Sequence, residues 1–136
     1  MKKANWILTF FVALISLFAS CRKEKQDSSK QMIGVWKGTA DPNSTAAPFE
    51  INFAENGKIT DVKWGNFLTT VVGSESQWSV AGSSLTFQFK VTSIAGVDQA
   101  TGTGTINGTT ISGTFTNSHI YGSTVVSTGS FTLVKQ

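Results

Sequence analysis

The chain contains a single cysteine, Cys21, and a single histidine, His119. One cysteine cannot form an intramolecular disulfide, so the fold does not depend on one. One histidine and one cysteine cannot complete a closed zinc site either, and the sequence predicts neither a metal nor a cofactor. A catalytic triad is not recognisable, because the nearest acidic residue upstream of His119 is the distant Asp98. We therefore expect no enzymatic activity.

Positive charge is scarce once the first thirty residues are set aside. The whole chain has a net charge of +3, but the basic residues at positions 2, 3, 22, 23, 25 and 30 all precede Gln31. From Gln31 onward, five lysines stand against six acidic residues, so this part carries a net charge of −1. A nucleic-acid-binding protein needs a clustered basic face. The composition therefore excludes nucleic acid as a partner.

The N-terminal apolar run is too short to cross a bilayer comfortably. It covers positions 6–20, fifteen residues with only Thr9 and Ser16 as internal polar interruptions, whereas a membrane-spanning helix needs about 20 residues. Lys2 and Lys3 precede it, and small residues end it. This order of charge, apolar run and small residues is typical of a secretory signal. We predict that residues 1–20 are a signal peptide.

The end of that run, Leu17-Phe18-Ala19-Ser20-Cys21, resembles the lipobox of bacterial lipoproteins. Ala19 and Ser20 match its small positions and Cys21 matches the lipidated residue, while Phe18 departs from the usual leucine. The resemblance implies that Cys21 is cut free, acylated and anchored in a membrane, since several acyl chains together bind a bilayer stably. Simple secretion is the alternative.

The segment after the cysteine lacks apolar residues from position 22 to position 31. Such a composition cannot bury enough surface to become ordered, so we expect residues 21–31 to be a lipidated, disordered tether and residues 32–136 to form one domain. In lipoprotein sorting, Asp after the lipidated cysteine favours the inner membrane, and this chain has Arg22 there. The resemblance thus implies an outer membrane lipoprotein in the cell envelope of a Gram-negative bacterium, at the periplasmic face or the cell surface.

The domain shows a hydrophobic period of two and no sustained helical stripe. Phe49, Ile51 and Phe53 alternate with polar or small residues, and the same alternation recurs in several later segments. Asn56-Gly57 and Asn107-Gly108 are typical hairpin turns, and positions 81–84 indicate a third. The predicted strands cover residues 33–40, 48–55, 58–64, 67–73, 76–80, 84–92, 99–107, 109–117 and 123–135.

Short local connections between so many strands predict an all-β, antiparallel, up-and-down β-barrel of about eight to ten strands, because closure removes exposed strand edges. A β-sandwich is the alternative. Gly34-Val35-Trp36 lies at the start of the first predicted strand and is similar to the G-x-W signature of lipocalins. The detailed match covers about 20 residues, and neither a T-D-Y motif nor a late arginine is present. The resemblance implies a lipocalin-like barrel in which Gly34 and Trp36 are structural.

Lipocalin-like barrels bind small apolar molecules, so the resemblance implies a small hydrophobic ligand in the cell envelope. The inward glycines, Gly102, Gly104, Gly113 and Gly129, indicate either a hollow barrel or one filled by large rings. His119 and Tyr121 fall in a predicted loop at residues 117–122 that would place them at a barrel mouth. The side chains expected to contact a ligand, or alternatively to pack the core, are Trp64, Trp78, Phe87, Phe89, Phe115, His119, Tyr121 and Phe131.

Charged residues are completely missing from Gln99 to Val134. Threonine and serine fill the alternate, outward positions of this stretch, most densely at Thr101, Thr103 and Thr105. Threonine suits an exposed strand face, which accounts for part of the pattern. The pattern also indicates an alternative function, in which a structural or interaction lipoprotein docks an envelope protein or a glycan through this outer face.

Overall fold

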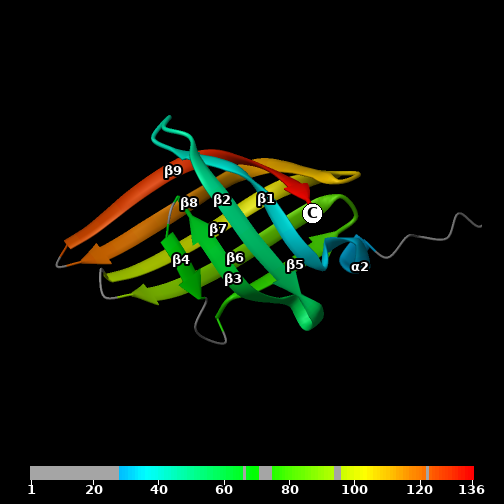
Figure 1. The fold of residues 1–136 in the computed structure, drawn as a ribbon, viewed down its shortest axis with the longest axis horizontal. Helices are drawn as coiled ribbons and strands as arrows, with labels where there is room; N and C mark the ends of the chain where they lie inside the picture. The colour runs from blue at the N-terminus through cyan, green and yellow to red at the C-terminus, as the bar shows by residue number, and fades with distance from the viewer. Residues whose placement is uncertain (1–27, 66, 71–74, 94–95, 122) are drawn as a thin grey trace, which may run out of the picture.

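The computed structural model describes residues 28–65, 67–70, 75–93, 96–121 and 123–136. The predicted signal peptide, Cys21 and most of the predicted tether lie outside these residues. The described chain consists of the helix α2 (Ser28–Met32), the 3-10 turn η1 (Glu55–Gly57) and the strands β1 (Gly34–Pro42), β2 (Ala47–Ala54), β3 (Lys58–Trp64), β4 (Phe67–Thr70), β5 (Gln77–Ala81), β6 (Ser84–Ser93), β7 (Gly96–Asn107), β8 (Thr110–Tyr121) and β9 (Ser123–Lys135) (Figure 1).

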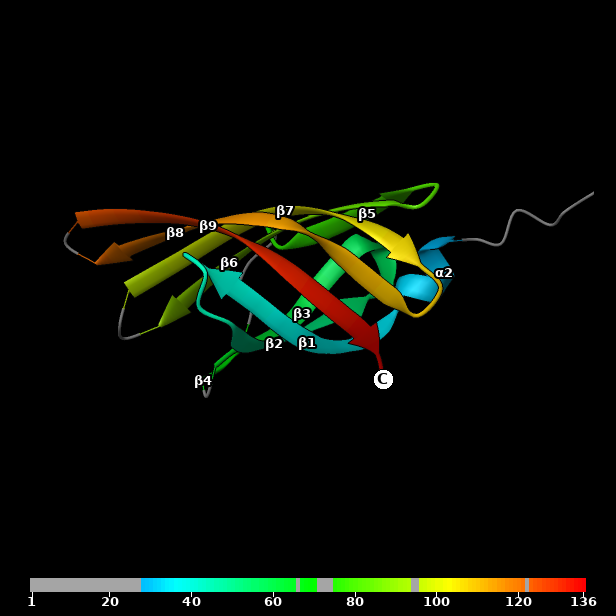
Figure 2. The same cartoon turned by 90° about the horizontal axis from the view of Figure 1, so that it is seen from above.

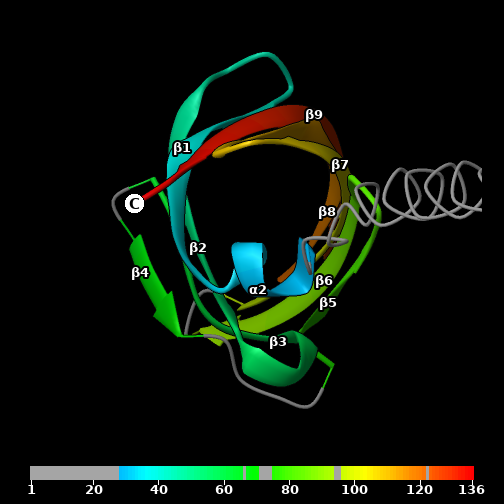
Figure 3. The same ribbon diagram turned by 90° about the vertical axis from the view of Figure 1, so that its right-hand side faces the viewer.

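The strands form one antiparallel sheet that closes on itself. The order is β2-β1-β9-β8-β7-β6-β5-β3-β4, and an additional pairing of β2 with β3 completes the ring. Eight strands make the barrel, while β4 pairs with β3 alongside it. Figure 3 looks into the ring, with β1–β3 on one side and β6–β8 across from them. The predicted up-and-down barrel is confirmed, and the sandwich alternative is wrong.

The seam between β3 and β5 has few strand pairs. Among the described residues, one register pair, Lys58 with Gln77, crosses it, and beside it the Ile59 N–H donates to the Ser76 carbonyl at 3.4 Å. The indole of the neighbouring Trp78 strengthens the seam, because its Nε1 donates to the carbonyl oxygens of Ala54 at 3.0 Å and Lys58 at 2.9 Å. Trp78 is 7% exposed, so these hydrogen bonds are shielded from water. Trp78, predicted to contact a ligand or the core, is therefore a structural residue of the seam.

The predicted hairpins form, and their loops differ in detail. Asn56 and Gly57 both have positive φ, as expected, but Glu55 joins them in a three-residue loop. At the second turn, Asn107 pairs with Thr110, so the loop consists of Gly108 and Thr109. Gly108 has a φ of 59° at the first loop position, which glycine adopts without steric cost. The turn is therefore shifted by one residue from the predicted Asn-Gly pair.

One end of the barrel is covered by α2, which lies across the opening in Figure 3. Met32 and Trp36 are fully buried there, and the Trp36 Nε1 donates to the Met32 carbonyl at 2.8 Å. The Gln31 amide donates to the Gly108 carbonyl at 2.7 Å, and Lys135 binds the Gln31 carbonyl. Residues 28–31, which belong to the predicted tether, form the first part of helix α2, and the helix ends at the buried Met32.

Strands β7 and β8 are longer than predicted, and β8 runs beside β9 to its end (Figure 2). This moves His119 out of a loop. The ladders β7–β8 and β8–β9 continue through the pairs Asp98 with His119 and His119 with Val125. The predicted loop at residues 117–122 is therefore wrong up to Tyr121, because the backbone groups of residues 117–121 are in register with β7 or β9. Among the described residues, no helix is long and apolar enough to span a bilayer.

Candidate functional site

The barrel interior is occupied by the large rings that the sequence singles out. Phe87 packs edge-on against Phe131 at a centroid distance of 5.5 Å and stacks on Phe89 at 6.2 Å. Trp78 packs edge-on against Phe53 at 5.7 Å. All five rings are at least 93% buried, since none is more than 7% exposed. These residues contact one another across the barrel and form its core.

The inward glycines provide the space for these rings. A Cβ added to Gly102 would overlap the Phe87 ring, and one added to Gly104 would lie 3.0 Å from Phe131 Cζ. A Cβ on Gly129 would lie 3.0 Å from Phe115 Cε1. Each glycine thus leaves free a volume that a phenylalanine from another strand occupies. Of the two sequence interpretations, the rings beside these glycines favour the filled barrel.

The end opposite α2 carries a second aromatic group. Trp64 packs against Phe49 at 5.4 Å and edge-on against Phe115 at 5.2 Å, and Phe49 lies 6.5 Å from Phe89. Trp64 is only partly buried, unlike the three phenylalanines. Of the two tryptophans predicted to contact a ligand, Trp64 is therefore the one whose side chain remains partly accessible to solvent.

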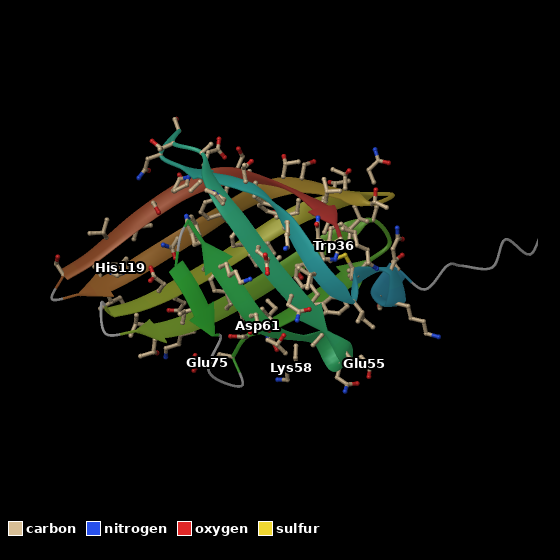
Figure 4. The ribbon with its side chains drawn as sticks, viewed as in Figure 1. Trp36, Glu55, Lys58, Asp61, Glu75 and His119 are labelled. Atoms are coloured by element: carbon tan, nitrogen blue, oxygen red, sulfur yellow. The ribbon has the colours of Figure 1, made fainter. Side chains whose placement is uncertain are left out.

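His119 belongs to a polar cluster at this same end, far from Trp36 in Figure 4. Its Nδ1 lies 2.9 Å from Asp98 Oδ1, and the Asn117 amide approaches the same oxygen at 3.4 Å. The buried Oδ1 of Asn117 has no hydrogen-bond partner among the described residues. Asp98 appeared remote in the sequence, and the β7–β8 ladder brings it to His119. Tyr121 ends β8, and its side chain is outside the described part of the chain.

A trough of about 860 Å³ lies on the outer face of β5–β9. Its walls are side chains that are exposed to solvent, such as Thr101 and Thr116, whereas the alternate residues Phe87 and Phe115 point into the core. The floor of the trough is therefore the backbone of these alternate residues, whose side chains point into the core. This hollow is thus outside the barrel, on the threonine-rich face.

Two rows of polar side chains form the walls, and each row crosses the strands in register. The first row comprises Gln77, Gln88, Thr101, Thr116 and Thr128. The second row comprises Ser79, Thr86, Thr103 and Thr114. Each strand contributes one residue to a row because outward side chains in register stand side by side on a sheet. The sequence pattern had indicated the threonines, but Gln77 and Gln88 were missed because they are far from the charge-free stretch in the chain.

The trough lining contains no charged residue. Charges gather instead on the outer face of β1–β3, where Glu50 binds Lys63 at 2.9 Å and Lys37 at 3.2 Å. The hydrogen bond from Lys63, with a smaller contribution from Lys37, holds the pKa of Glu50 below its ordinary value despite partial desolvation. Figure 3 places β1–β3 across the barrel from β6–β8. The two outer faces therefore differ in chemistry, one ionic and one neutral.

Within the described residues, no group of three or more His, Cys, Asp and Glu side chains is placed to hold a metal ion. The fold and its site define a closed, eight-stranded antiparallel barrel with a packed interior and a neutral outer trough. Comparison with protein-family models, with curated proteins and with solved structures finds no match to this chain.

Proposed function

We propose that this chain is a lipoprotein of the bacterial cell envelope, anchored through Cys21, whose barrel binds a neutral glycan in the outer trough. The observation that carries the proposal is the uncharged lining of hydroxyl and amide side chains around a hollow of about 860 Å³. Hydroxyl and amide groups both donate and accept hydrogen bonds, as sugar hydroxyls do. The resemblance of the N-terminal segment to a lipobox supports the location in the cell envelope. The proposed role is binding without catalysis.

The hydroxyls at the centre of the first row are available to a ligand. Thr101 and Thr116 face each other across β7 and β8, and both are exposed. Within the described part of the chain, neither hydroxyl forms a hydrogen bond with another residue. A glycan that bonds to them displaces only water, so it meets no competing protein contact. These two residues are the ones to alter first.

The test measures binding of soluble neutral polysaccharides to the full chain, purified in a zwitterionic detergent without a sugar headgroup. The double variant Thr101→Val, Thr116→Val removes two hydroxyls while it preserves β-branched shape, and we expect at least a tenfold loss of affinity. The matched control Thr105→Val, Thr132→Val alters exposed threonines outside the trough and should bind as the unaltered chain does. Equal affinity in both variants, or no binding by the unaltered chain, would contradict the proposal.

A second candidate function, binding of a small hydrophobic molecule, is supported by the end of the barrel that holds Trp64. This ring is partly exposed, and the nearby strand β8 carries the unpaired Oδ1 of Asn117. A ligand with an apolar body and one hydrogen-bond donor suits that combination. Native mass spectrometry of the full chain, after exposure to a host-cell lipid extract, tests it. A discrete bound mass that Trp64→Ala removes supports this candidate, and a bare mass across several extracts rejects it.

A further inference from the structure

We infer that the occupant of the trough is an extended linear glycan that lies across the strands, with about one sugar residue over each strand. This inference rests on the proposed function and specifies the ligand's shape and direction. It follows from three properties of the two rows: their repeat along the trough, their separation, and the state of their hydroxyl groups.

The first row gives the trough a regular repeat. Its members are directly paired from strand to strand, Gln77 with Gln88, Gln88 with Thr101, Thr101 with Thr116 and Thr116 with Thr128. Neighbouring strands in a sheet lie about 4.8 Å apart, so the row spans about 19 Å from β5 to β9. That step is comparable to the length of one pyranose residue in an extended chain. A linear glycan can therefore meet an equivalent polar group at each successive sugar.

The second row sets the width. Thr103 follows Thr101 by two residues on β7, and Thr114 precedes Thr116 by two on β8. Two residues along a strand correspond to about 7 Å. This separation accommodates a flat sugar ring whose hydroxyls project at both edges. The trough is consequently long across the strands and narrow along them, which favours a chain that runs perpendicular to the strands.

An extended peptide fits the same surface less well. Peptides that bind to sheets add to a strand edge and use its backbone hydrogen bonds. Strands β6, β7 and β8 are each paired on both sides, so their backbone groups are already engaged. A peptide also repeats about every 3.3 Å, which does not match the strand spacing of about 4.8 Å. The geometry therefore favours sugars over amino acids as the repeating unit.

The lining also selects for a neutral chain. Two lysines flank the first row: Lys58 is the register partner of Gln77, and Lys90 is paired with Glu75 at 3.4 Å. The Gln88 amide also donates to the Glu75 carbonyl at 3.0 Å. At the far end of the second row, Ser130 donates to Asp41 at 2.6 Å. The lining itself therefore offers an anionic glycan no cation, and the carboxylate bound to Ser130 lies just beyond its end.

The centre of the first row makes the strongest contribution. Ser79 and Thr86 in the second row already share a hydrogen bond at 2.7 Å. Within the described chain, the exposed hydroxyls of Thr101, Thr116 and Thr128 form none. Thr101 is also the third of the five positions in its row, so a trisaccharide that spans three adjacent strands contacts it in every register. Loss of its hydroxyl therefore affects short and long glycans alike.

The test is a chain-length series measured by calorimetry on the full chain in the same detergent. The probes are neutral β-1,4-linked oligosaccharides of glucose, mannose, xylose and N-acetylglucosamine with one to seven residues. Coiled α-1,4-linked glucose oligomers of equal length serve as the matched control. We expect affinity to rise more than tenfold from two residues to five and then to level off, with the α-linked series weaker at every length.

The variants separate a ligand role from a structural one. Gln77→Ala and Thr128→Val, at the two ends of the row, should weaken the five-residue glycan and leave the three-residue glycan unchanged, because a short chain can shift away. Thr101→Val should weaken both. If affinity levels off at one or two sugars, or if the α-linked series binds equally well, the inference is wrong while the proposed function stands. If no probe binds, the proposed function fails as well.

Discussion

Gly102 on β7 stands directly opposite Phe87 on β6, and the ring of Phe87 occupies the space that a Gly102 side chain would need. The same row continues to Phe115 and then to Gly129, so rings and glycines alternate along it. This alternation fills the barrel beneath the trough with tightly matched volumes. The packing is therefore sensitive to a single added methyl group.

Gly102→Ala should destabilise the full chain by about 1–3 kcal/mol, the usual cost of overpacking a core. Urea unfolding measures the effect. Phe87→Leu reduces the ring that the new methyl group meets, so the double variant should lose less stability than the two single variants together. Additive losses would show that Phe87 is not what excludes a side chain at Gly102.

Trp36→Phe should destabilise the barrel more than Trp64→Phe does. Trp36 is fully buried, and its Nε1 supplies the hydrogen bond to the Met32 carbonyl. Without the indole nitrogen that carbonyl loses this partner, which costs about 1–3 kcal/mol. Trp64 is only partly buried and serves as the control. Equal shifts of the urea midpoint would rule out a special role for the Trp36 hydrogen bond at the covered end.

Gly57→Ala should cost more stability than Gly108→Ala. Both glycines have positive φ, 72° and 59°, which costs a non-glycine residue about 1–2 kcal/mol. A Cβ at Gly108 would meet open space, but one at Gly57 would lie 2.8 Å from the Trp78 carbonyl. Thermal unfolding of the two variants separates backbone strain from this clash. A larger loss for Gly108→Ala would contradict the explanation.

Glu50→Gln should reduce stability at neutral pH and much less in acid. The folded-state pKa of Glu50 is lowered, mainly by the hydrogen bond from Lys63, so the unfolded carboxyl takes up its proton first as the pH falls. The stabilisation is present above the ordinary pKa of 4.5 and disappears as the pH falls through the lowered folded value. Because both lysines are about half-exposed, the effect should stay below about 1 kcal/mol.

Urea unfolding of Glu50→Gln at pH 7 and pH 3 checks this direction, with Glu55→Gln at an exposed turn as the control. If the loss in free energy of unfolding caused by Glu50→Gln grew from pH 7 to pH 3, the lysine contacts could not be the cause of that loss.

Cys21→Ser should abolish acylation of the chain. In Gram-negative cells fed an alkyne-tagged fatty acid, the unaltered chain should carry the label and fractionate with the outer membrane. The variant should carry none, because serine lacks the thiol that the acyl transfer uses. Ser20→Ala keeps a small residue before the cysteine and should retain the label. A labelled Cys21→Ser variant would disprove the predicted anchor site.

The local alternation of apolar and polar residues, together with the turn residues, was sufficient to predict most of the fold. Alternation of the kind seen at Phe49, Ile51 and Phe53 depends only on neighbours in the chain, so strand positions could be predicted closely. Hairpin connections could be predicted for the same reason, because a turn at Gly108 constrains only the residues beside it. Helix α2 was missed, since Met32 is ordered by the covered barrel end and not by its own sequence neighbours.

What the sequence by itself determined was thus the period of two, the turns and the charge-free stretch, all of which are local properties. Only the tertiary structure decided that His119 meets Asp98, that Phe87 fills the space beside Gly102, and that the hollow lies outside the barrel. The physical reason is register. A row such as Gln77 to Thr128 exists only after five strands have paired, and that pairing depends on closure of the whole ring.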